Sequence, residues 1–240
     1  MNRILLEPGE LRDGIATLRD ERLTHIRDVL RAQPGERVRA GVVDGSRYEA
    51  ELVSIDAEAC TLKLLREQAP LPPPPVDLLL ALPRPKCLRR LWPQLAAMGV
   101  RRLYIANAEK VDRSYWGSHL LDPAEYRPLL LEGLSQAGDT RVPQIRLVRR
   151  LKPLVEDELA PGYEAGFKWV AHPGGRRDSP SGATEPRLLA VGPEGGWSDY
   201  EMRMFAGCGF ETLGLGERTL RTDTACIALL AVFGAPLAGM

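Results

Sequence analysis

The sequence predicts an α/β protein in which a small β-barrel is followed by a larger domain built on a mostly parallel sheet. Three observations support this fold class. A proline-rich run at 69–75 divides the chain, because consecutive prolines favour an extended spacer and cannot join a helix or a central strand. Before it, polar and apolar residues alternate as they do in strands with one buried face. After it, short apolar strands alternate with helical patterns, which is typical of parallel sheets.

The module at 1–68 is predicted to contain one helix followed by strands. Apolar residues at helical spacing predict the helix over 21–30. Asp44-Gly45 is a hairpin signal between the first two predicted strands. The strands are expected at 37–43, 47–55 and 60–65. We expect a small twisted barrel with one helix.

The domain at 76–240 is predicted to alternate strands and helices. Its strands are expected at 76–82, 102–106, 144–148, 167–171, 188–191 and 211–215. Helices are expected at 88–98, ended by Gly99, and at 124–137. Ligands of such sheets bind at the carboxyl ends of the strands.

The composition excludes several classes of protein. Formal net charge is zero, so no global field indicates nucleic acid or membrane, and 44% hydrophobic with 27% charged residues is ordinary for a soluble globular protein. The four cysteines form no C-x-x-C pair, which indicates buried thiols in a reducing cytoplasm. The N-terminus has no apolar signal-peptide core, and the apolar stretch 225–237 is too short to span a membrane. We expect a soluble, cytoplasmic protein.

Two glycine-rich turns near the C-terminus are the most informative motifs. The first is Gly192-Pro-Glu-Gly-Gly-Trp-Ser198 after an apolar strand, and Ser198 with Glu201 predicts a capping box for the next helix. The second, Leu213-Gly-Leu-Gly216, again joins a strand to a helix. Side by side, such loops make a pocket that recognises a small molecule through main-chain groups. The alternative is that each only turns the chain; neither matches the dinucleotide fingerprint or a P-loop.

The second turn also carries charge. Arg218 and Arg221 place two cations beside it, which suggests an anionic co-substrate such as a phosphodiester backbone. Thr222 can cap the final helix, and Asp223 lies where the helix dipole favours an anion. The alternative reading makes Arg221 and Asp223 a local ion pair.

At these residues the chain resembles a known family. The first turn, together with the Leu213–Ala225 segment, is similar to the RsmE-type 16S ribosomal RNA (uracil-N3)-methyltransferases of the SPOUT class. The resemblance runs the whole length, and the two C-terminal motifs are its specific part. It implies a PUA-like RNA-binding β-barrel at 1–68, a linker at 69–75, and at 76–240 a SPOUT methyltransferase domain with a C-terminal trefoil knot. It also implies a homodimer that acts on 16S ribosomal RNA, in the small ribosomal subunit.

The resemblance implies S-adenosylmethionine as the cofactor, held by the two loops and the segment around His172. The expected cofactor-binding residues are His172, Pro173, Gly192, Pro193, Glu194, Gly195, Leu213, Gly214, Leu215, Gly216, Leu220, Asp223, Thr224 and Ala225. Arg218 and Arg221 are the expected catalytic residues, because each can stabilise charge on the uracil carbonyl oxygens as N3 loses its proton. Glu194 and Asp223 are both candidates for the general base. No metal is expected.

This chain departs from the family pattern at several positions. Asp223 stands where relatives often have Glu, and Gln94 and Ala97 where they commonly have Lys and Glu. Ser135 replaces a frequent Glu. The departures bear on the target nucleotide more than on the cofactor.

Basic residues independently suggest RNA contact, since clustered Lys and Arg neutralise phosphates. Two runs lack an intervening acidic residue, one from Arg84 to Arg102 and one from Arg141 to Lys152. The expected RNA-binding residues are Arg19, Arg22, Arg27, Arg84, Lys86, Arg89, Arg90, Gln136 and Arg141. The alternative is a solvated helix face.

Two other functions stay open. One is a SPOUT methyltransferase for transfer RNA or another ribosomal position. The other is a noncatalytic RNA-binding or ribosome-assembly protein, which would bind RNA without affinity for S-adenosylmethionine. The three histidines are widely separated and are read as packed or surface residues.

Overall fold

The computed structural model describes residues 2–72, 76–164, 167–176 and 187–234. Residues 73–75 of the predicted linker and 235–237 of the apolar stretch lie outside these ranges. The chain divides into two compact units: the first combines the N-terminal residues up to Pro72 with Leu131–Val142, and the second contains the rest.

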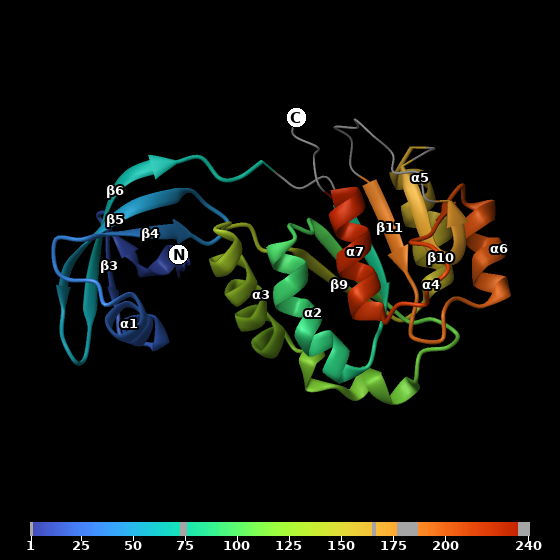
Figure 1. Ribbon diagram of the computed structural model, residues 1–240, viewed down its shortest axis with the longest axis horizontal. Coiled ribbons are helices and arrows are strands. Elements are labelled where there is room, and N and C mark those ends of the chain that lie inside the picture. Colours follow the sequence, from blue (N-terminus) through green and yellow to red (C-terminus); the bar gives the residue numbers. More distant parts are fainter. Residues whose placement is uncertain (1, 73–75, 165–166, 177–186, 235–240) are drawn as a thin grey trace. The chain divides into compact units, whose positions relative to one another are not determined.

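The first unit is built on a curled six-stranded sheet with strand order β1-β4-β5-β6-β3-β2 (Figure 1). Its strands are β1 (Ile4–Leu6), β2 (Leu11–Arg12), β3 (Ile15–Leu18), β4 (Arg37–Val42), β5 (Arg47–Ile55) and β6 (Cys60–Gln68). All recorded pairs are antiparallel except β1 with β4. The alternation of polar and apolar residues points one face inward, where Leu6, Leu52 and Leu62 are fully buried.

The predicted elements of this unit are present, together with strands that were not predicted. The helix over 21–30 is α1 (Glu21–Thr24) continued by a π-helical segment, His25–Leu30. Asp44 makes the predicted hairpin turn with φ of 58°. Strands β1 to β3 are two to four residues long, too short to display a clear alternation.

The segment Leu131–Val142 completes the first unit by hydrogen bonding to β1 and to the β4–β5 hairpin. The main-chain N–H of Arg3 donates to the carbonyl of Ser135 at 2.9 Å, and Ser135 Oγ donates back to the Arg3 carbonyl at 2.7 Å. Thr140 accepts from the N–H of Asp44 and donates through Oγ1 to the carbonyl of Gly45. A Cβ on Gly41 would lie 2.6 Å from Thr140 Cγ2, so the close fit requires glycine there.

The second unit contains a parallel sheet with strand order β12-β10-β11-β7-β8-β9. The strands are β7 (Val76–Ala81), β8 (Arg102–Ala106), β9 (Gln144–Val148), β10 (Lys168–Arg176), β11 (Arg187–Val191) and β12 (Glu211–Leu213). Every residue of β7 and β11 is buried, as expected for central strands of a covered sheet. The predicted alternation and parallel sheet are confirmed.

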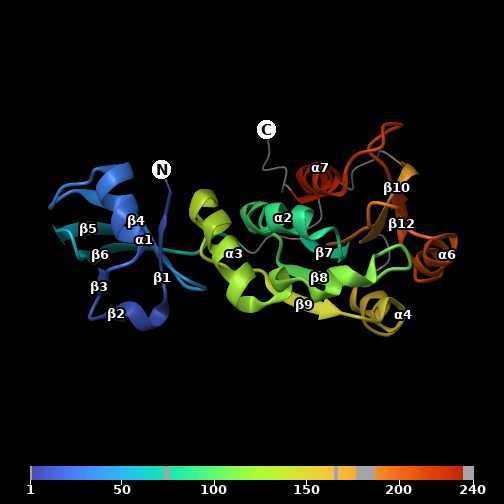
Figure 2. The same ribbon diagram turned by 90° about the horizontal axis from the view of Figure 1, so that it is seen from below.

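Helices cover both faces of this sheet. The helices of this unit are α2 (Pro85–Ala97), α4 (Leu151–Pro153) leading through a π-helical segment into α5 (Ala160–Gly162), α6 (Asp199–Gly207) and α7 (Thr222–Gly234), together with the start of α3 (Pro123–Ala137), whose residues from Leu131 on belong to the first unit. Helices α2 and α7 lie side by side on one face, and α4 and α6 lie on the other (Figures 1 and 2). The helical stretch 151–162 was not predicted, because Pro153 and Pro161 interrupt its pattern. None of the helices in the described ranges is long and apolar enough to span a membrane.

A buried carboxylate closes the amino-terminal edge of this sheet. Asp77, at the start of β7, is fully buried and accepts two hydrogen bonds from Arg101, at 2.9 and 2.5 Å. The main-chain N–H of Arg102 and the hydroxyl of Tyr163 also donate to this carboxylate. Burial and the bond to Asp77 raise the pKa of Tyr163 above its ordinary value. These side chains tie β7, β8 and α5 together.

Candidate active site

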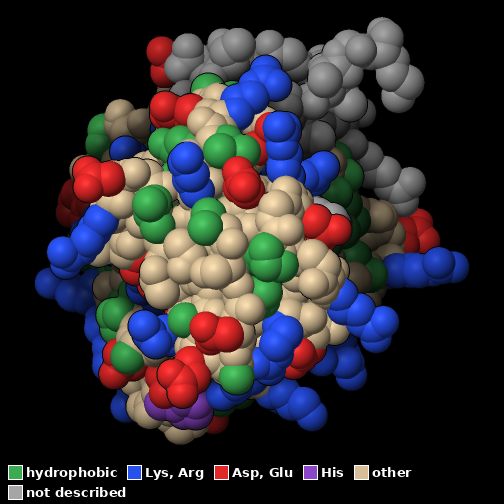
Figure 3. Space-filling model, turned by 90° about the vertical axis from the view of Figure 1, so that its left-hand side faces the viewer, with side chains coloured by type: hydrophobic (Ala, Val, Ile, Leu, Met, Phe, Trp, Pro, Cys, Tyr) green, Lys and Arg blue, Asp and Glu red, His purple; other side chains and the backbone are tan. Residues whose placement is uncertain are grey.

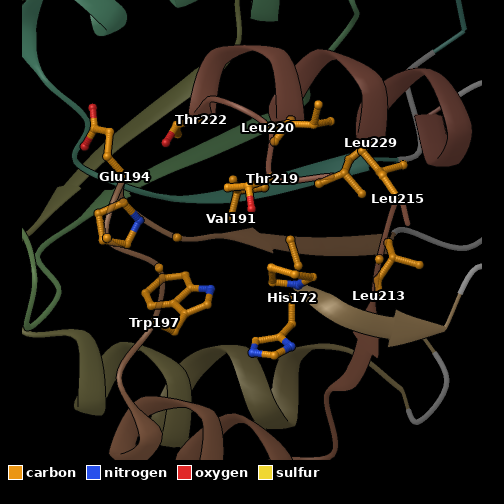
Figure 4. A pocket seen from close by; sticks show the side chains of 18 of the residues that line it. His172, Val191, Glu194, Trp197, Leu213, Leu215, Thr219, Leu220, Thr222 and Leu229 are labelled. Atoms are coloured by element: carbon orange, nitrogen blue, oxygen red, sulfur yellow. The ribbon is translucent and has the colours of Figure 1, made fainter. Parts of the chain in front are cut away.

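A cavity of about 390 Å³ opens at the carboxyl-terminal edge of the same sheet, between the ends of β10, β11 and β12 (Figure 4). Both glycine-rich turns line it, as their predicted positions at one sheet edge require. Its volume falls in the range of small-molecule sites, about 300–1,000 Å³. Leu220 and Leu229 lie on the side of α7, and Trp197 and His172 on the opposite side (Figure 4).

The first turn is shaped by tight packing of its own tryptophan. A Cβ on Gly192 would lie 3.2 Å from both the main-chain nitrogen and Nε1 of Trp197, and Gly196 has φ of 69°. Trp197 is buried and packs edge-to-face on Phe205 of α6 at 4.9 Å between ring centroids. The predicted capping box is present: Ser198 N–H donates to the Glu201 carboxylate, and Glu201 N–H donates to Ser198 Oγ. The turn is therefore fixed to α6.

The second turn is shaped by backbone-to-backbone contact. A Cβ on Gly214 would lie 2.8 Å from the carbonyl oxygen of Gly175 and 3.0 Å from that of His172. A Cβ on Gly175 would in turn lie 2.3 Å from the carbonyl carbon of Leu213. Only glycine permits main chains to approach this closely. The sequence shows a Gly-Gly pair at 174–175, but the reason for glycine at 175 becomes evident only when the second turn packs against it in the folded chain.

Lys110, from the loop after β8, forms part of the cavity wall. Its Nζ donates to the carbonyls of Gly195 at 3.0 Å and Trp197 at 3.3 Å. The neighbouring N–H of Glu109 donates to the buried carboxylate of Glu201 at 2.8 Å. Nothing local in the sequence distinguishes Lys110 from a surface lysine, because its partners are more than eighty residues away.

Glu194 is held by the start of α2. Its Oε1 accepts a hydrogen bond from the main-chain N–H of Arg84 at 3.0 Å, which satisfies a donor at the helix N-terminus. The carboxylate therefore links the first turn to α2. This placement favours a structural role for Glu194 over that of a general base.

The structure brings together most of the residues predicted at the cofactor site. Those that line the cavity are His172, Pro173, Gly192, Pro193, Glu194, Gly195, Leu213, Gly214, Leu215, Gly216, Leu220 and Ala225. Of the two predicted catalytic residues, Arg218 lines the cavity as well. Residues that line it without having been assigned to it are Lys110, Ala171, Val191, Gly196, Trp197, Thr219, Thr222 and Leu229.

Asp223, Thr224 and Arg221 are not among the lining residues. The Asp223 carboxylate accepts a hydrogen bond from Arg90 of α2 at 2.6 Å. An ion pair with Arg221 was the alternative drawn from the sequence, and it is wrong: the partner is a cation 133 positions away. Thr222 is the first residue of α7 rather than the residue before it.

The predicted RNA-binding residues differ in their availability. Arg22 is bound by Glu10, Asp20 and the carbonyl of Leu5, so it serves the first unit's own structure. Arg27 pairs with the adjacent Asp28. Figure 3 shows basic and acidic side chains interspersed on the face it presents. The exposed predicted residues are Arg19, Arg27, Arg84, Lys86, Arg89, Arg90 and Gln136, while Arg141 is half-buried.

The four cysteines are free thiols. Cys60, Cys87 and Cys226 are buried, and burial raises their pKa values, that of Cys87 to about 11. A raised pKa keeps a thiol protonated and unreactive. Within the described ranges no three His, Cys, Asp or Glu side chains are placed to hold a metal ion.

Comparison with known proteins places the two units in one family. Residues 70–234 match the model of the RNA methyltransferase domain, and residues 18–65 match that of the RNA methyltransferase PUA domain. A ribosomal RNA small subunit methyltransferase E of Treponema pallidum is 32% identical over 97% of this chain and 90% of its own length. A second relative of the same description, from Borreliella burgdorferi, is 22% identical over both full lengths.

Solved structures share the fold. The ribosomal RNA small subunit methyltransferase E of Neisseria gonorrhoeae, bound to S-adenosylmethionine, superposes with a TM-score of 0.73 at 22% identity, covering 96% of this chain and 95% of that one. A putative methyltransferase from Legionella pneumophila, also with S-adenosylmethionine, gives 0.72 at 24% identity, covering 97% of each chain. With a family model matching more than half of the chain and the Treponema relative matching nearly all of it, this protein belongs to the RsmE family of RNA methyltransferases.

Proposed function

We propose that this chain uses S-adenosylmethionine to methylate N3 of a uridine in 16S ribosomal RNA, acting in the cytoplasm as a homodimer. The observation that carries the proposal is the cavity walled by two glycine-rich turns. The names of the relatives support the substrate, and the two cofactor-bound structures support the cofactor.

The residues of the cavity fit this cofactor. Gly192 and Gly214 both line the cavity and have no side chain, which suits recognition of an adenosine by backbone hydrogen bonds. Leu215, Leu220 and Leu229 supply apolar surface for a flat ring. Trp197 lines the cavity, and its buried Nε1 has no acceptor in the described part of the chain. When bound, the cofactor supplies a methyl group on a sulfonium.

Arg218 is the cation placed to act on the nucleobase. Uracil N3 carries a weakly acidic proton, and its loss puts negative charge on the adjacent carbonyl oxygens. A guanidinium at the cavity wall stabilises that charge and remains protonated while doing so. Arg221, exposed at the start of α7, is the second proposed cation and would contact the RNA from outside the cavity. Positioning of N3 in line with the methyl group supplies much of the remaining acceleration.

A C-terminal trefoil knot is part of this proposal. Supporting it is the close approach of Gly175, near the end of β10, to Leu213 and Gly214 at the end of β12. A knot at this place would give the cavity a wall that cannot open without unthreading. Knots are rare enough that no pattern of periodicity predicts one.

The test has two parts. Calorimetric titration with S-adenosylmethionine is expected to show binding, with NAD and ATP as negative controls. Reverse transcription of 16S ribosomal RNA incubated with enzyme and cofactor should then stop at one uridine, because an N3-methyl group blocks base pairing. If the protein binds the cofactor but reverse transcription stops in transfer RNA instead, the result would favour a transfer RNA methyltransferase. RNA binding without cofactor binding would favour a noncatalytic assembly protein.

A further inference from the structure

A second feature of the same sheet edge is a tryptophan covered by an arginine. The guanidinium of Arg149, directly after β9, lies 4.3 Å from the ring centroid of Trp116. Trp116 belongs to a short 3₁₀ helix, Arg113–Gly117, in the loop after β8. The two residues are 33 positions apart in sequence and meet because β8 and β9 are neighbours and both end here.

Asn107 holds this pair in a fixed geometry. Its main-chain N–H donates to the carbonyl of Val148 at 2.9 Å, so it is anchored beside Arg149. Its side-chain Oδ1 accepts from Trp116 Nε1 at 3.0 Å, which orients the indole ring. One residue therefore positions both members of the stack before any ligand arrives.

Neither Arg149 nor the adjacent Arg150 has a carboxylate partner in the described ranges, whereas two other cations of the same run are paired. Arg146 binds Glu158 through both terminal nitrogens, and Lys152 lies 3.8 Å from Glu156. Arg149 is exposed, and its recorded contact is the aromatic ring. Its donors remain free to bind an acceptor from outside. The run from Arg141 to Lys152 thus contains cations that are paired with carboxylates and cations that are not, and among these Arg149 is set apart by its contact with the ring of Trp116.

The loop that carries Trp116 also forms part of the cavity wall. Between Asn107 and Trp116 it includes Lys110, whose amine is bound to the carbonyls of Gly195 and Trp197. A ligand on the Trp116–Arg149 stack would be connected to the cavity by fewer than ten residues of anchored loop.

We propose that the Trp116–Arg149 stack is a nucleobase-binding subsite, which takes a nucleotide next to the one that enters the cavity. The inference rests on the proposed function, because it assumes single-stranded RNA at this edge. Unpaired bases stack on aromatic rings and on guanidinium planes, and arginine adds hydrogen bonds to base edges or phosphate. A purely electrostatic contact would not need the indole ring or its alignment by Asn107. Stacking on a flanking base would hold the RNA in register while the target base leaves its neighbours.

Tryptophan fluorescence gives a direct test. Of the four tryptophans, Trp92, Trp169 and Trp197 are at most 7% exposed, whereas Trp116 is only half-buried. Titration with an oligouridine of about a dozen nucleotides should quench emission of the wild-type protein, and the quenching should disappear in Trp116→Phe. Inorganic polyphosphate should bind without quenching, because it has charge and no bases. Quenching of Trp116→Phe equal to that of the wild type would overturn the proposal, as would failure of the oligouridine to bind.

Affinity measurements separate stacking from charge. Trp116→Ala and Arg149→Ala should each weaken oligouridine binding roughly tenfold, with S-adenosylmethionine affinity unchanged. Arg146→Ala is the matched control, since it removes the same charge three residues away and should change binding less than about twofold. Equal loss in Arg146→Ala and Arg149→Ala would show general electrostatics and overturn the subsite. If the wild type transfers methyl groups and Trp116→Ala still binds RNA normally, the subsite is wrong and the proposed function stands. If the wild type does not bind the cofactor, the proposed function itself is wrong.

Discussion

At the amino ends of β7 and β8 the chain closes its parallel sheet with charged side chains, whereas at the carboxyl ends of β10, β11 and β12 it leaves a cavity walled by glycines and apolar side chains. The closed edge contains a fully buried carboxylate with its donors directed at it. At the open edge the polar side chains Lys110, Glu194 and Glu201 bind main-chain groups of the surrounding loops. We therefore expect the closed edge to contribute mainly to stability and the open edge mainly to ligand binding, so that substitutions at the two edges separate these properties.

The largest effect is expected from Asp77→Ala at the closed edge. It leaves Arg101 and Tyr163 without their acceptor, so the free energy of unfolding should fall by about 3 kcal/mol, as when one partner of a buried pair is removed. Urea denaturation measures this. Arg146→Ala, which breaks an exposed pair with Glu158, is the control and should cost less than about 1 kcal/mol. If Asp77→Ala abolished cofactor affinity in the folded protein, the separation of the two edges would be wrong.

Gly214→Ala at the open edge should lower the affinity for S-adenosylmethionine while the protein remains folded. The added Cβ would lie 2.8 Å from the Gly175 carbonyl oxygen, and neither main chain can yield without moving the other. Overpacking of this kind costs about 1–3 kcal/mol, which here should appear as a loss of S-adenosylmethionine affinity of roughly tenfold or more by calorimetry. Gly207→Ala is a suitable control, because its Cβ would meet nothing within 4 Å. If Gly214→Ala bound S-adenosylmethionine with normal affinity, the close approach of Gly214 to Gly175 would not be needed for the cavity to bind the cofactor.

Alkaline pH should weaken the closed edge through Tyr163. Its pKa in the folded protein is raised, chiefly by burial and then by its bond to Asp77, above the ordinary value of 10.0. The folded state therefore holds this proton more tightly than the unfolded state, so the stabilisation is complete below pH 10 and is lost as the pH rises beyond it. Tyr163→Phe should cost about 1 kcal/mol at neutral pH and show a flatter stability profile between pH 9 and 11. Parallel profiles for the two proteins would assign the alkaline loss to other groups.

Glu194→Gln should have the smallest effect. The amide oxygen can still accept the N–H of Arg84, so cofactor affinity and the methyl-transfer rate should change less than about threefold. Glu194→Ala, which removes the acceptor, should weaken affinity more than the amide does. A loss of methyl transfer in Glu194→Gln with cofactor binding intact would instead identify Glu194 as the general base.

The same two edges show what can be predicted from the sequence. The strands 102–106 and 144–148 were predicted with the bounds that the structure gives, because short runs rich in β-branched, aromatic and other apolar residues are a local signal, although 102–106 is mostly buried and 144–148 is largely exposed at the edge of the sheet. The cavity residues on the two turns were predicted because clustered glycines after a strand are visible in the sequence. Lys110 and the partner of Asp223 were missed, since both depend on loops that meet only in the folded chain. The pairing of Arg22 with Glu10 was not foreseen either, because the two residues are twelve positions apart and meet only in the folded chain, whereas its other partner, Asp20, is a sequence neighbour.

The segment Leu131–Val142 has a consequence for how the protein is made. It completes the first unit, against Arg3, Gly41 and Asp44, although it is separated from them by the start of the second unit. During synthesis the first 72 residues leave the ribosome without this cover, and the missing piece follows only after β7, α2 and β8 have been made. The N-terminal unit must therefore wait for a stretch of its neighbour's sequence before it reaches its final form. The order in which the segments are synthesised therefore differs from their grouping into units in the folded protein.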